Sequence, residues 1–446
     1  MTQVTPFAAT GPAAATPKLL DPPVRLALAM WGLAVAFYLF GFFHRVTPAV
    51  LTTELMLDFQ LSAAMLGNLS AFYFYFYAAM QLPTGVLVDR FGPRRVLWIG
   101  AMIGGVGALL FAFADTFASA ALGRGLIGAT VAVAWVSMLK LCAHWFDARR
   151  LGMVTGVSLA VGTMGAVMAG LPLRALSDAL GWRPVIGASG IVALLIAAGI
   201  FFLMRDDPVQ RGFRSQIPAG AAFHAPSLRT ILSGLGRIWA YRNVPLLFWV
   251  PSGICGAFLT FTGLWGVPFL VQQHGLTPRS ASLVTSGMLI AFSVGSIAFG
   301  ILSDRIRLRK LPYVIGGSFT LISYGVLYIF PDGRLSVLVP LLLLGAAGSG
   351  SMAVGFLYSR ESAPLALSGT VAGAVNMGVM VGPLFQQPLI GWILDKNWSG
   401  ALLDGVRVYD LHAYKLAFGL LLLWVASSCV ALLATRETHC RQYREP

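Results

Sequence analysis

The chain contains 446 residues, of which 57% are apolar and 11% are charged. Soluble domains carry charges on about a quarter of their residues, so this composition excludes a soluble enzyme, a disordered chain and a secreted disulfide scaffold. Twelve helices of about 22 residues, each long enough to cross a hydrocarbon core of about 30 Å, would account for nearly all of the apolar residues. The apolar runs are also continuous rather than alternating, which disfavours a membrane β-barrel.

The net charge of +14 would suggest nucleic-acid binding in a soluble protein. In a membrane protein it must first be compared with the positive-inside rule. The four cysteines lack the spacing of a metal site or a disulfide framework, and the chain has no nucleotide-binding P-loop. We therefore predict no cofactor, no metal and no nucleic-acid partner. The expected partners are a small-molecule substrate and the lipid bilayer, with the chain acting as a monomer.

The apolar runs also predict the domain organisation. Residues 1–25, rich in Ala, Thr and Pro, are expected to form a flexible cytoplasmic tail. The longest polar gap separates two sets of six runs, so we predict six-helix bundles at 26–204 and 244–434. A linker at 205–243 and a tail at 435–446 are both expected in the cytoplasm. The twelve predicted spans are 26–51, 64–87, 96–115, 117–143, 151–176, 184–204, 244–272, 280–302, 312–330, 336–358, 368–394 and 412–434.

The two halves repeat one another in corresponding loops. At a constant offset of 215 positions, Gly85, Asp89, Arg90, Arg94 and Arg95 recur as Gly300, Asp304, Arg305, Arg309 and Lys310. A second repeat pairs Asp178 and Trp182 with Asp395 and Trp398, at offsets of 217 and 216. Repeats at half the chain length predict an internally duplicated protein. Secondary transporters use such duplication to build two halves around a central site.

The distribution of lysine and arginine predicts the orientation in the membrane. With the N-terminus inside, the inner tails and loops contain 21 of these residues and the outer loops contain seven. This threefold excess places both termini in the cytoplasm. The high net charge then reflects topology, and we expect an integral protein of the inner or plasma membrane.

The loop between the second and third spans resembles the signature of the major facilitator superfamily. It reads Gly85-Val-Leu-Val-Asp89-Arg90-Phe-Gly92-Pro-Arg94-Arg95, and its degenerate copy contains Asp304 and Arg305. Arg124-Gly-Leu-Ile-Gly128 is similar to an element of the superfamily's fourth span. The resemblance covers nearly the whole chain. It implies an all-α fold of twelve transmembrane helices in two six-helix bundles, with alternating access to a central cavity.

The spacing of the signature loop and its repeat predict a gating role. Gly85 is expected to allow close helix approach. Asp89 can accept hydrogen bonds from helix N-terminal amides or from an arginine across the bundle interface, and the loop would then latch one conformation. The alternative is a solvated basic loop that only sets topology.

Two groups within the superfamily look similar to this chain. His44-Arg45-Val46 and Pro48 resemble the organic-anion symporters, in which an arginine on the first span meets a substrate carboxylate. Gly263-Leu-Trp265-Gly-Val-Pro268 and Gln387-Pro388-Leu-Ile-Gly391 resemble relatives of bacterial amino-acid and lysosomal dipeptide transporters. The sequence leaves both groups open.

Charged residues within the spans are candidates for substrate binding, because a charge inside the bilayer costs several kcal/mol. Arg45 lies about 28 Å along the first span and can bind a carboxylate or phosphate through two-pronged hydrogen bonds. Alternatively, it snorkels to the outer headgroups. Arg124 can contact substrate or tie helices together. Lys140 can line an inward-facing cavity or snorkel to the surface.

Polar residues on two further spans are also candidates. Tyr73, Tyr77 and Gln81 share one face of the second span, which forms either a polar cavity wall or an aromatic packing seam. Asn376 and Gln387 lie eleven residues apart, close to three helical turns, so they share a face of the eleventh span. Amides facing a bundle interior hydrogen-bond either a neighbouring helix or a ligand.

The predicted interior contains no carboxylate, since all 17 acidic residues fall at helix ends, in loops or in tails. A positive interior favours an anionic or zwitterionic substrate and leaves the coupling ion open. We therefore predict a secondary active or facilitative transporter for a small organic anion or an amino-acid-like solute. The alternatives are an efflux carrier of the same fold and a non-transporting membrane sensor or scaffold.

Overall fold

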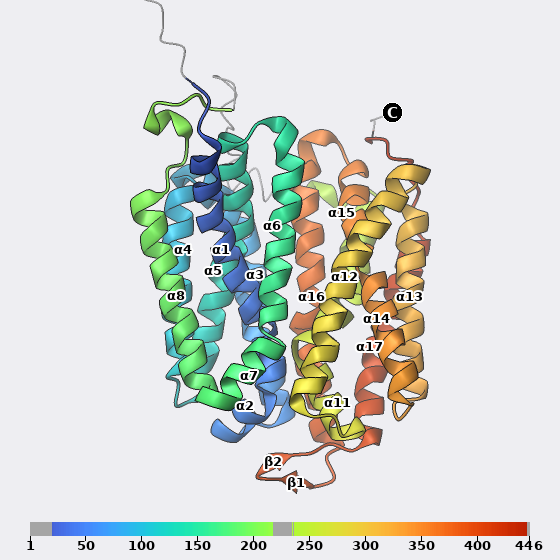
Figure 1. The fold of residues 1–446 in the computed structure, drawn as a ribbon. Coiled ribbons are helices and arrows are strands. Elements are labelled where there is room, and N and C mark those ends of the chain that lie inside the picture. Colours follow the sequence, from blue (N-terminus) through green and yellow to red (C-terminus); the bar gives the residue numbers. More distant parts are fainter. Residues whose placement is uncertain (1–19, 217–233, 235, 444–446) are drawn as a thin grey trace, which may run out of the picture.

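The computed structural model describes residues 20–216, 234 and 236–443. The two halves of the chain form two groups of helices that lie side by side (Figure 1). Eleven of the described helical segments are long and apolar enough to cross a membrane, and a bent segment brings the number to twelve. The predicted all-α architecture is therefore confirmed. Most of the predicted tail at 1–25 and part of the linker at 205–243 lie outside the described residues.

The first bundle contains eight helices that form six spans. They are α1 (Val24–Val50), α2 (Thr52–Asp58), α3 (Ala63–Phe91), α4 (Pro93–Ala112), α5 (Phe117–Trp145), α6 (Ala148–Met168), α7 (Leu171–Leu180) and α8 (Trp182–Leu203). α6 and α7 together make the fifth span, interrupted at Ala169 and Gly170. α3 bends by 60° between Gln81 and Pro83, because proline lacks a backbone N–H and clashes with the preceding turn.

The second bundle follows a linker that contains η1 (Pro208–Arg211). Its elements are α10 (Asn243–Thr260), η2 (Phe261–Trp265), α11 (Gly266–His274), α12 (Pro278–Ile306), α13 (Lys310–Ile329), α14 (Leu335–Ser349), α15 (Met352–Glu361), η3 (Leu365–Leu367), α16 (Ser368–Lys396), β1 (Leu402–Leu403), β2 (Val406–Arg407) and α17 (Leu411–Leu433). α10, η2 and α11 form one span, as do α14 and α15. β1 and β2 pair as an antiparallel hairpin between the last two spans.

The two ends of the molecule differ in what they contain. The terminal face is the end at which α1 begins and α8 and α17 finish, at the top of Figure 1. The hairpin face is the opposite end, which contains the β1–β2 hairpin. These two faces are the ends at which an alternating-access protein opens and closes in turn.

Helices within a bundle approach closely where a glycine faces the backbone of a neighbour. A Cβ atom at Gly128 in α5 would overlap the carbonyl group of Tyr73 in α3, and one at Gly378 in α16 would overlap that of Phe248 in α10. Lipid offers helices no hydrophobic driving force to associate, so close contact at small residues supplies much of the attraction. Gly128 thereby determines how closely the helix that carries Tyr73 packs in the first bundle.

We predict that Gly128→Ala destabilises the protein, because the added methyl group would overlap the Tyr73 carbonyl. Overpacking of this kind costs about 1–3 kcal/mol, and thermal unfolding of the detergent-purified protein would measure it. Gly156→Ala in α6 is the matched control, since its Cβ would meet no atom within 4 Å and alanine favours a helix. Equal stability of the two variants would contradict this assignment.

Candidate functional site

Arg45 lies near the end of α1 among aromatic rings. Its residue surface is 7% exposed, and its guanidinium carbon lies 4.3 Å from the centre of the Phe42 ring, 5.6 Å from Tyr77 and 5.8 Å from Tyr73. Such cation–π contacts stabilise a guanidinium without neutralising its charge. Among the described residues no carboxylate pairs with Arg45, and its Nε atom is buried without a hydrogen-bond partner. The charge of Arg45 is therefore uncompensated.

Helical spacing explains how these rings come together. Phe42 precedes Arg45 by three positions and therefore lies on the same face of α1, although it was not among the predicted site residues. Tyr73 and Tyr77 lie one turn apart on α3, and their rings stack with centroids 6.1 Å apart. The Tyr73 hydroxyl donates to the Gly41 carbonyl at 3.2 Å, which fixes α3 against α1 beside Arg45.

The second bundle contributes Gln387 and a π-helical turn to the same place. Gln387 in α16 is fully buried, and neither its amide oxygen nor its amide nitrogen has a hydrogen-bond partner within the described ranges. A Cβ atom at Gly263 in η2 would lie 3.4 Å from Gln387 Nε2 and 3.8 Å from the Arg45 carbonyl oxygen. Buried unpaired polar groups are costly, and π turns are frequent at functional sites. The candidate site is therefore built from both bundles.

Arg124 is a second buried arginine that pairs with no carboxylate of the described residues. Its Nη1 donates to the carbonyl of His44 at 2.6 Å, whereas Nε and Nη2 have no partner. Its guanidinium carbon lies 5.3 Å from the centre of the Tyr73 ring, so both arginines contact the same tyrosine. The neighbouring His44 places Nε2 3.0 Å from the hydroxyl of Ser189, which holds the imidazole against α8.

Lys140 and Asp89 form an ion pair near the terminal face. Lys140 Nζ donates to Asp89 Oδ1 at 2.6 Å and to the Val88 carbonyl at 3.3 Å. The expected partner of Asp89, a helix amide or an arginine of the other bundle, is thus not its partner in this conformation. The reason is that α5 brings a cation of the same bundle within hydrogen-bond distance of this partly buried carboxylate.

Two glycines of the signature loop have different environments. A Cβ atom at Gly85 would meet no other atom within 4 Å, so the close helix approach that we expected there is absent from this conformation. Gly92 has a φ of +81°, and a Cβ there would lie 2.7 Å from the carboxylate of Asp206. That carboxylate accepts the Arg94 amide at 2.6 Å, so Asp206 caps the start of α4.

The repeated loop in the second bundle is held by the same kind of cap. Glu437 accepts the backbone amides of Arg309 and Lys310, both at 2.8 Å, at the start of α13. The Arg309 side chain pairs with Glu361 at 2.9 Å and with Asp304 at 2.7 Å. Burial lowers the pKa of Arg309, but the two carboxylates outweigh it and raise the pKa above its ordinary value. The sequence repeat therefore corresponds to a repeated helix cap.

The remaining predicted residues make few contacts. Gln81 and Asn376 are half-buried and form no hydrogen bond with the part of the chain that the structure describes. Arg90, Arg95 and Arg305 are exposed. Their roles in substrate binding or gating stay predictions.

A model of the Major Facilitator Superfamily matches residues 26–385 and, in a second overlapping match, residues 253–442. The chain belongs to this superfamily. It is 24% identical over 395 residues to a probable sulfoacetate transporter, SauU, of Cupriavidus necator, covering 82% of this chain and 87% of that protein. It is 23% identical over 428 residues to a probable galactarate/D-glucarate transporter, GarP, of Escherichia coli, covering 87% of this chain and 88% of the relative.

The fold also matches solved structures of the superfamily. A bacterial homologue of the human lysosomal transporter Spinster, in an inward-facing and unoccupied conformation, aligns with a TM-score of 0.72 and 16% identity, covering 93% of this chain and 98% of that one. This likeness shows the fold. Together with the family match and the relatives, it identifies the protein as a membrane transporter and not an enzyme.

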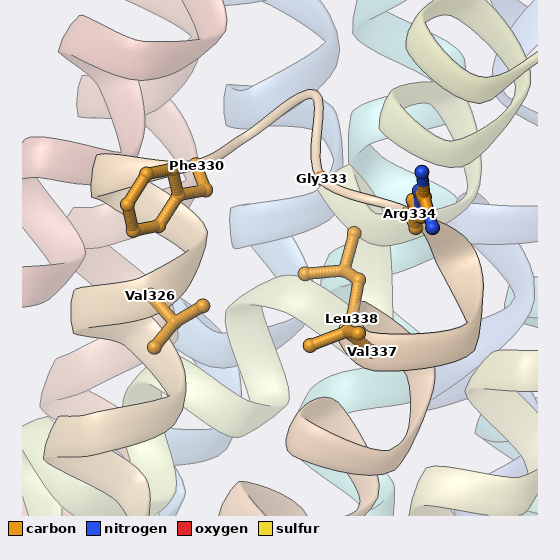
Figure 2. Close-up of a pocket in the computed structure, with 6 residues that line it drawn as sticks. All are labelled: Val326, Phe330, Gly333, Arg334, Val337 and Leu338. Atoms are coloured by element: carbon orange, nitrogen blue, oxygen red, sulfur yellow. The ribbon is translucent and has the colours of Figure 1, made fainter.

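A groove elsewhere on this superfamily member contains none of the predicted substrate residues. It has a volume of about 210 Å³ and lies where α13 turns into α14 at the hairpin face (Figure 2). Its lining residues are Val326, Phe330, Gly333, Arg334, Val337 and Leu338. Arg334 is exposed, so it offers a comparison for the buried Arg45.

We predict that Asp89 and Lys140 of the transporter act as a pair. Asp89→Asn and Lys140→Gln should each lower stability, and a double-mutant cycle of thermal unfolding should give a coupling of about 1 kcal/mol for a partly exposed pair. Arg95→Gln, at an exposed arginine of the same loop, is the control and should leave stability unchanged. If Lys140 instead binds substrate, the two substitutions would be additive, and only Lys140→Gln would weaken substrate binding.

Proposed function

We propose that the protein transports a small organic anion that bears a carboxylate, and that Arg45 binds this carboxylate. The observation that carries the proposal is a buried guanidinium with aromatic contacts and an unpaired Nε, which has no carboxylate partner among the described residues. A buried charge without compensation is strongly unfavourable. A substrate carboxylate would supply both the missing charge and two parallel hydrogen-bond acceptors.

The charge balance favours an anion over a zwitterion. Arg124 adds a second positive charge with two unpaired nitrogen atoms, and it contacts the same tyrosine as Arg45. An amino-acid-like solute would need a carboxylate for its ammonium group, and the described residues around Tyr73 offer none. Of the two substrate classes left open by the sequence, the geometry therefore supports the organic anion.

Gln387 would couple binding to the movement of the two bundles. Its amide lies next to the backbone of Arg45 across Gly263 and has both a free donor and a free acceptor. A substrate held by Arg45 of the first bundle and by Gln387 of the second would draw the two together. Tyr73 and Tyr77 would form the wall beside it, and the predicted roles of Gln81, Asn376 and Lys140 would concern later steps of its passage.

The relatives support the same substrate class. SauU and GarP are named as probable transporters of sulfoacetate and of galactarate or D-glucarate, and all of these solutes are organic anions. The protein would act as a monomer, because one chain supplies both halves of the site. The signature loop with Asp89 would close the terminal face in the opposite conformation, when Asp89 exchanges Lys140 for a partner in the second bundle.

We predict that Arg45→Ala abolishes binding and uptake of the anion while the protein still inserts and stays monodisperse. Arg45→Lys should recover little, because an ammonium group cannot reproduce two parallel hydrogen bonds. Losing a desolvated charge pair should cost about 2–5 kcal/mol, a factor of about 30 to several thousand in affinity. Ligand-induced thermal stabilisation and proteoliposome uptake, with D-glucarate and sulfoacetate as first probes and alanine as a zwitterion, would measure it.

The control for this experiment is Arg334→Lys, at the exposed arginine of Figure 2. It should leave binding and uptake unchanged. Near wild-type affinity in Arg45→Lys would show that Arg45 is only an interfacial anchor. Stabilisation by alanine, but by none of a panel of small organic anions, would contradict the anionic substrate.

We further propose that the terminal face is cytoplasmic, because most lysines and arginines lie in its loops and tails. A cysteine at the exposed Ala401, beside the hairpin, should react with an impermeant thiol reagent added to whole cells. One at the exposed Gln210, in the linker, should react only after permeabilisation. The reverse pattern would overturn the proposed orientation.

A further inference from the structure

Among the described residues, hydrogen bonds join the two bundles at one face only. Every hydrogen bond that the structure shows between described residues of different bundles lies at the hairpin face. At the terminal face, Asp89 pairs within its own bundle, and Cβ atoms at Gly85 and Gly300 would meet no atom within 4 Å. The contacts at the hairpin face therefore keep that end closed in this conformation.

Asp395, near the end of α16, accepts two of these four hydrogen bonds. Its two carboxylate oxygens accept the backbone amides of Ala63 at 3.1 Å and Ala64 at 2.8 Å, at the start of α3 in the other bundle. Tyr409 and Arg407 of its own bundle hold the same carboxylate, at 2.8 Å and 3.2 Å. A carboxylate at a helix N-terminus is stabilised by the helix dipole and by charge-assisted hydrogen bonds.

Asp178 makes the corresponding contact from the first bundle. It lies near the end of α7, and its Oδ2 accepts Arg279 Nε, near the start of α12 in the second bundle, at 3.0 Å. Arg279 follows Ala64 by 215 positions, the offset of the signature loop, and Asp395 follows Asp178 by 217. Each acid therefore ends the fifth span of its own bundle and contacts the start of the second span of the other.

Close backbone packing surrounds these contacts. A Cβ atom at Gly391 of α16 would overlap the Ala63 carbonyl, and one at Gly67 of α3 would lie 2.5 Å from the Gln387 carbonyl oxygen. On the other side of the interface, a Cβ at Gly170 would overlap the hydroxyl of Ser286 in α12. The helices of the two bundles therefore lie in close contact at this face.

We propose that Asp395 and Asp178 form two symmetry-related latches that hold the hairpin face closed, and that both must break for this face to open. The Asp395 latch is the stronger. The Asp395 side chain is 17% exposed and accepts hydrogen bonds from two backbone amides. The side chains of Asp178 and Arg279 are 34% and 60% exposed, so solvent screens the attraction between them. The proposal concerns the conformational cycle and does not depend on which solute is carried.

The test measures how fast a buried cysteine becomes accessible. Ser282→Cys, in a background with the four native cysteines replaced, places a thiol at a fully buried position of α12, where the Ser282 carbonyl lies 3.4 Å from a Cβ built at Gly170 of the other bundle. Asp395→Asn keeps the side-chain size but loses the charge and one acceptor. It should raise the labelling rate at Ser282→Cys about tenfold or more, since the rate follows the fraction of open molecules.

A second reporter distinguishes opening from general loosening. Gly373→Cys in α16 lies in the half of that helix nearer the terminal face, at an exposed position with open space around its Cβ. Opening of the hairpin face should be accompanied by closing of the terminal face, so labelling at Gly373→Cys should slow in the Asp395→Asn protein. Faster labelling at both positions would mean that the protein is merely destabilised, and would overturn the proposal.

Asp410→Asn is the matched control, because Asp410 also lies at the hairpin face and caps a helix, but the capped amide, that of Ala413 at 2.8 Å, belongs to its own bundle. This variant should not change labelling at Ser282→Cys. If Asp410→Asn raised the labelling rate as much as Asp395→Asn does, the loss of any acidic side chain at this face would open it. That result would overturn the proposal.

Arg279→Ala tests the second latch at an exposed side chain, so the proposal stays testable if Asp395→Asn fails to fold. It should raise the labelling rate about twofold to fivefold, as expected for a surface ion pair. The combination with Asp395→Asn should exceed either single change. Wild-type labelling in Arg279→Ala, or in a folded Asp395→Asn protein, would contradict the proposal.

Discussion

A charge in the low-dielectric interior of a membrane protein is costly unless another charge or hydrogen bonds compensate it. This constraint places the described carboxylates at helix ends, where Asp206 and Glu437 cap helices at the terminal face and Asp395 caps one at the hairpin face. Arg45 and Arg124 depart from the pattern, because both are buried and neither pairs with a carboxylate in the described part of the chain. A bound anion would supply what they lack, so one physical rule accounts for the helix caps and for the proposed site.

The acidic side chains at helix ends act in two ways, depending on whether they contact their own bundle or the other one. At the terminal face, Asp206 and Glu437 each cap a helix of their own bundle, which helps each bundle to move as a rigid body. At the hairpin face, Asp395 and Asp178 instead contact the start of a helix in the other bundle. The first kind of contact persists through a conformational change, whereas the second must break. A carboxylate therefore stabilises either a bundle or a conformation, depending on whether its partner lies across the interface.

Much of the fold could be predicted from local properties of the chain. The length of each apolar run predicts a span, and the predicted 96–115 corresponds to α4 at Pro93–Ala112. Arg45 could be identified as a candidate because burying a charged arginine in an apolar span costs free energy, whichever span contains it. Two of the three rings around Arg45, those of Tyr73 and Tyr77, belong to predicted site residues, whereas Phe42 was not predicted. The pairing of Lys140 with Asp89, 51 positions apart, could not be predicted, because it depends on how α3 and α5 pack.

Twelve apolar helices, the internal duplication and the uncompensated positive charge could therefore all be inferred from the sequence. These follow from backbone hydrogen bonds that must be satisfied within each span and from the cost of polar groups in lipid, both of which are local. Which charges meet depends instead on how the helices pack in three dimensions. Asp395 and Ala63 are 332 positions apart, and Gln387 approaches Arg45 from the other bundle. Electrostatic attraction falls with distance in space rather than along the chain, so these partners exist only once the bundles are packed together.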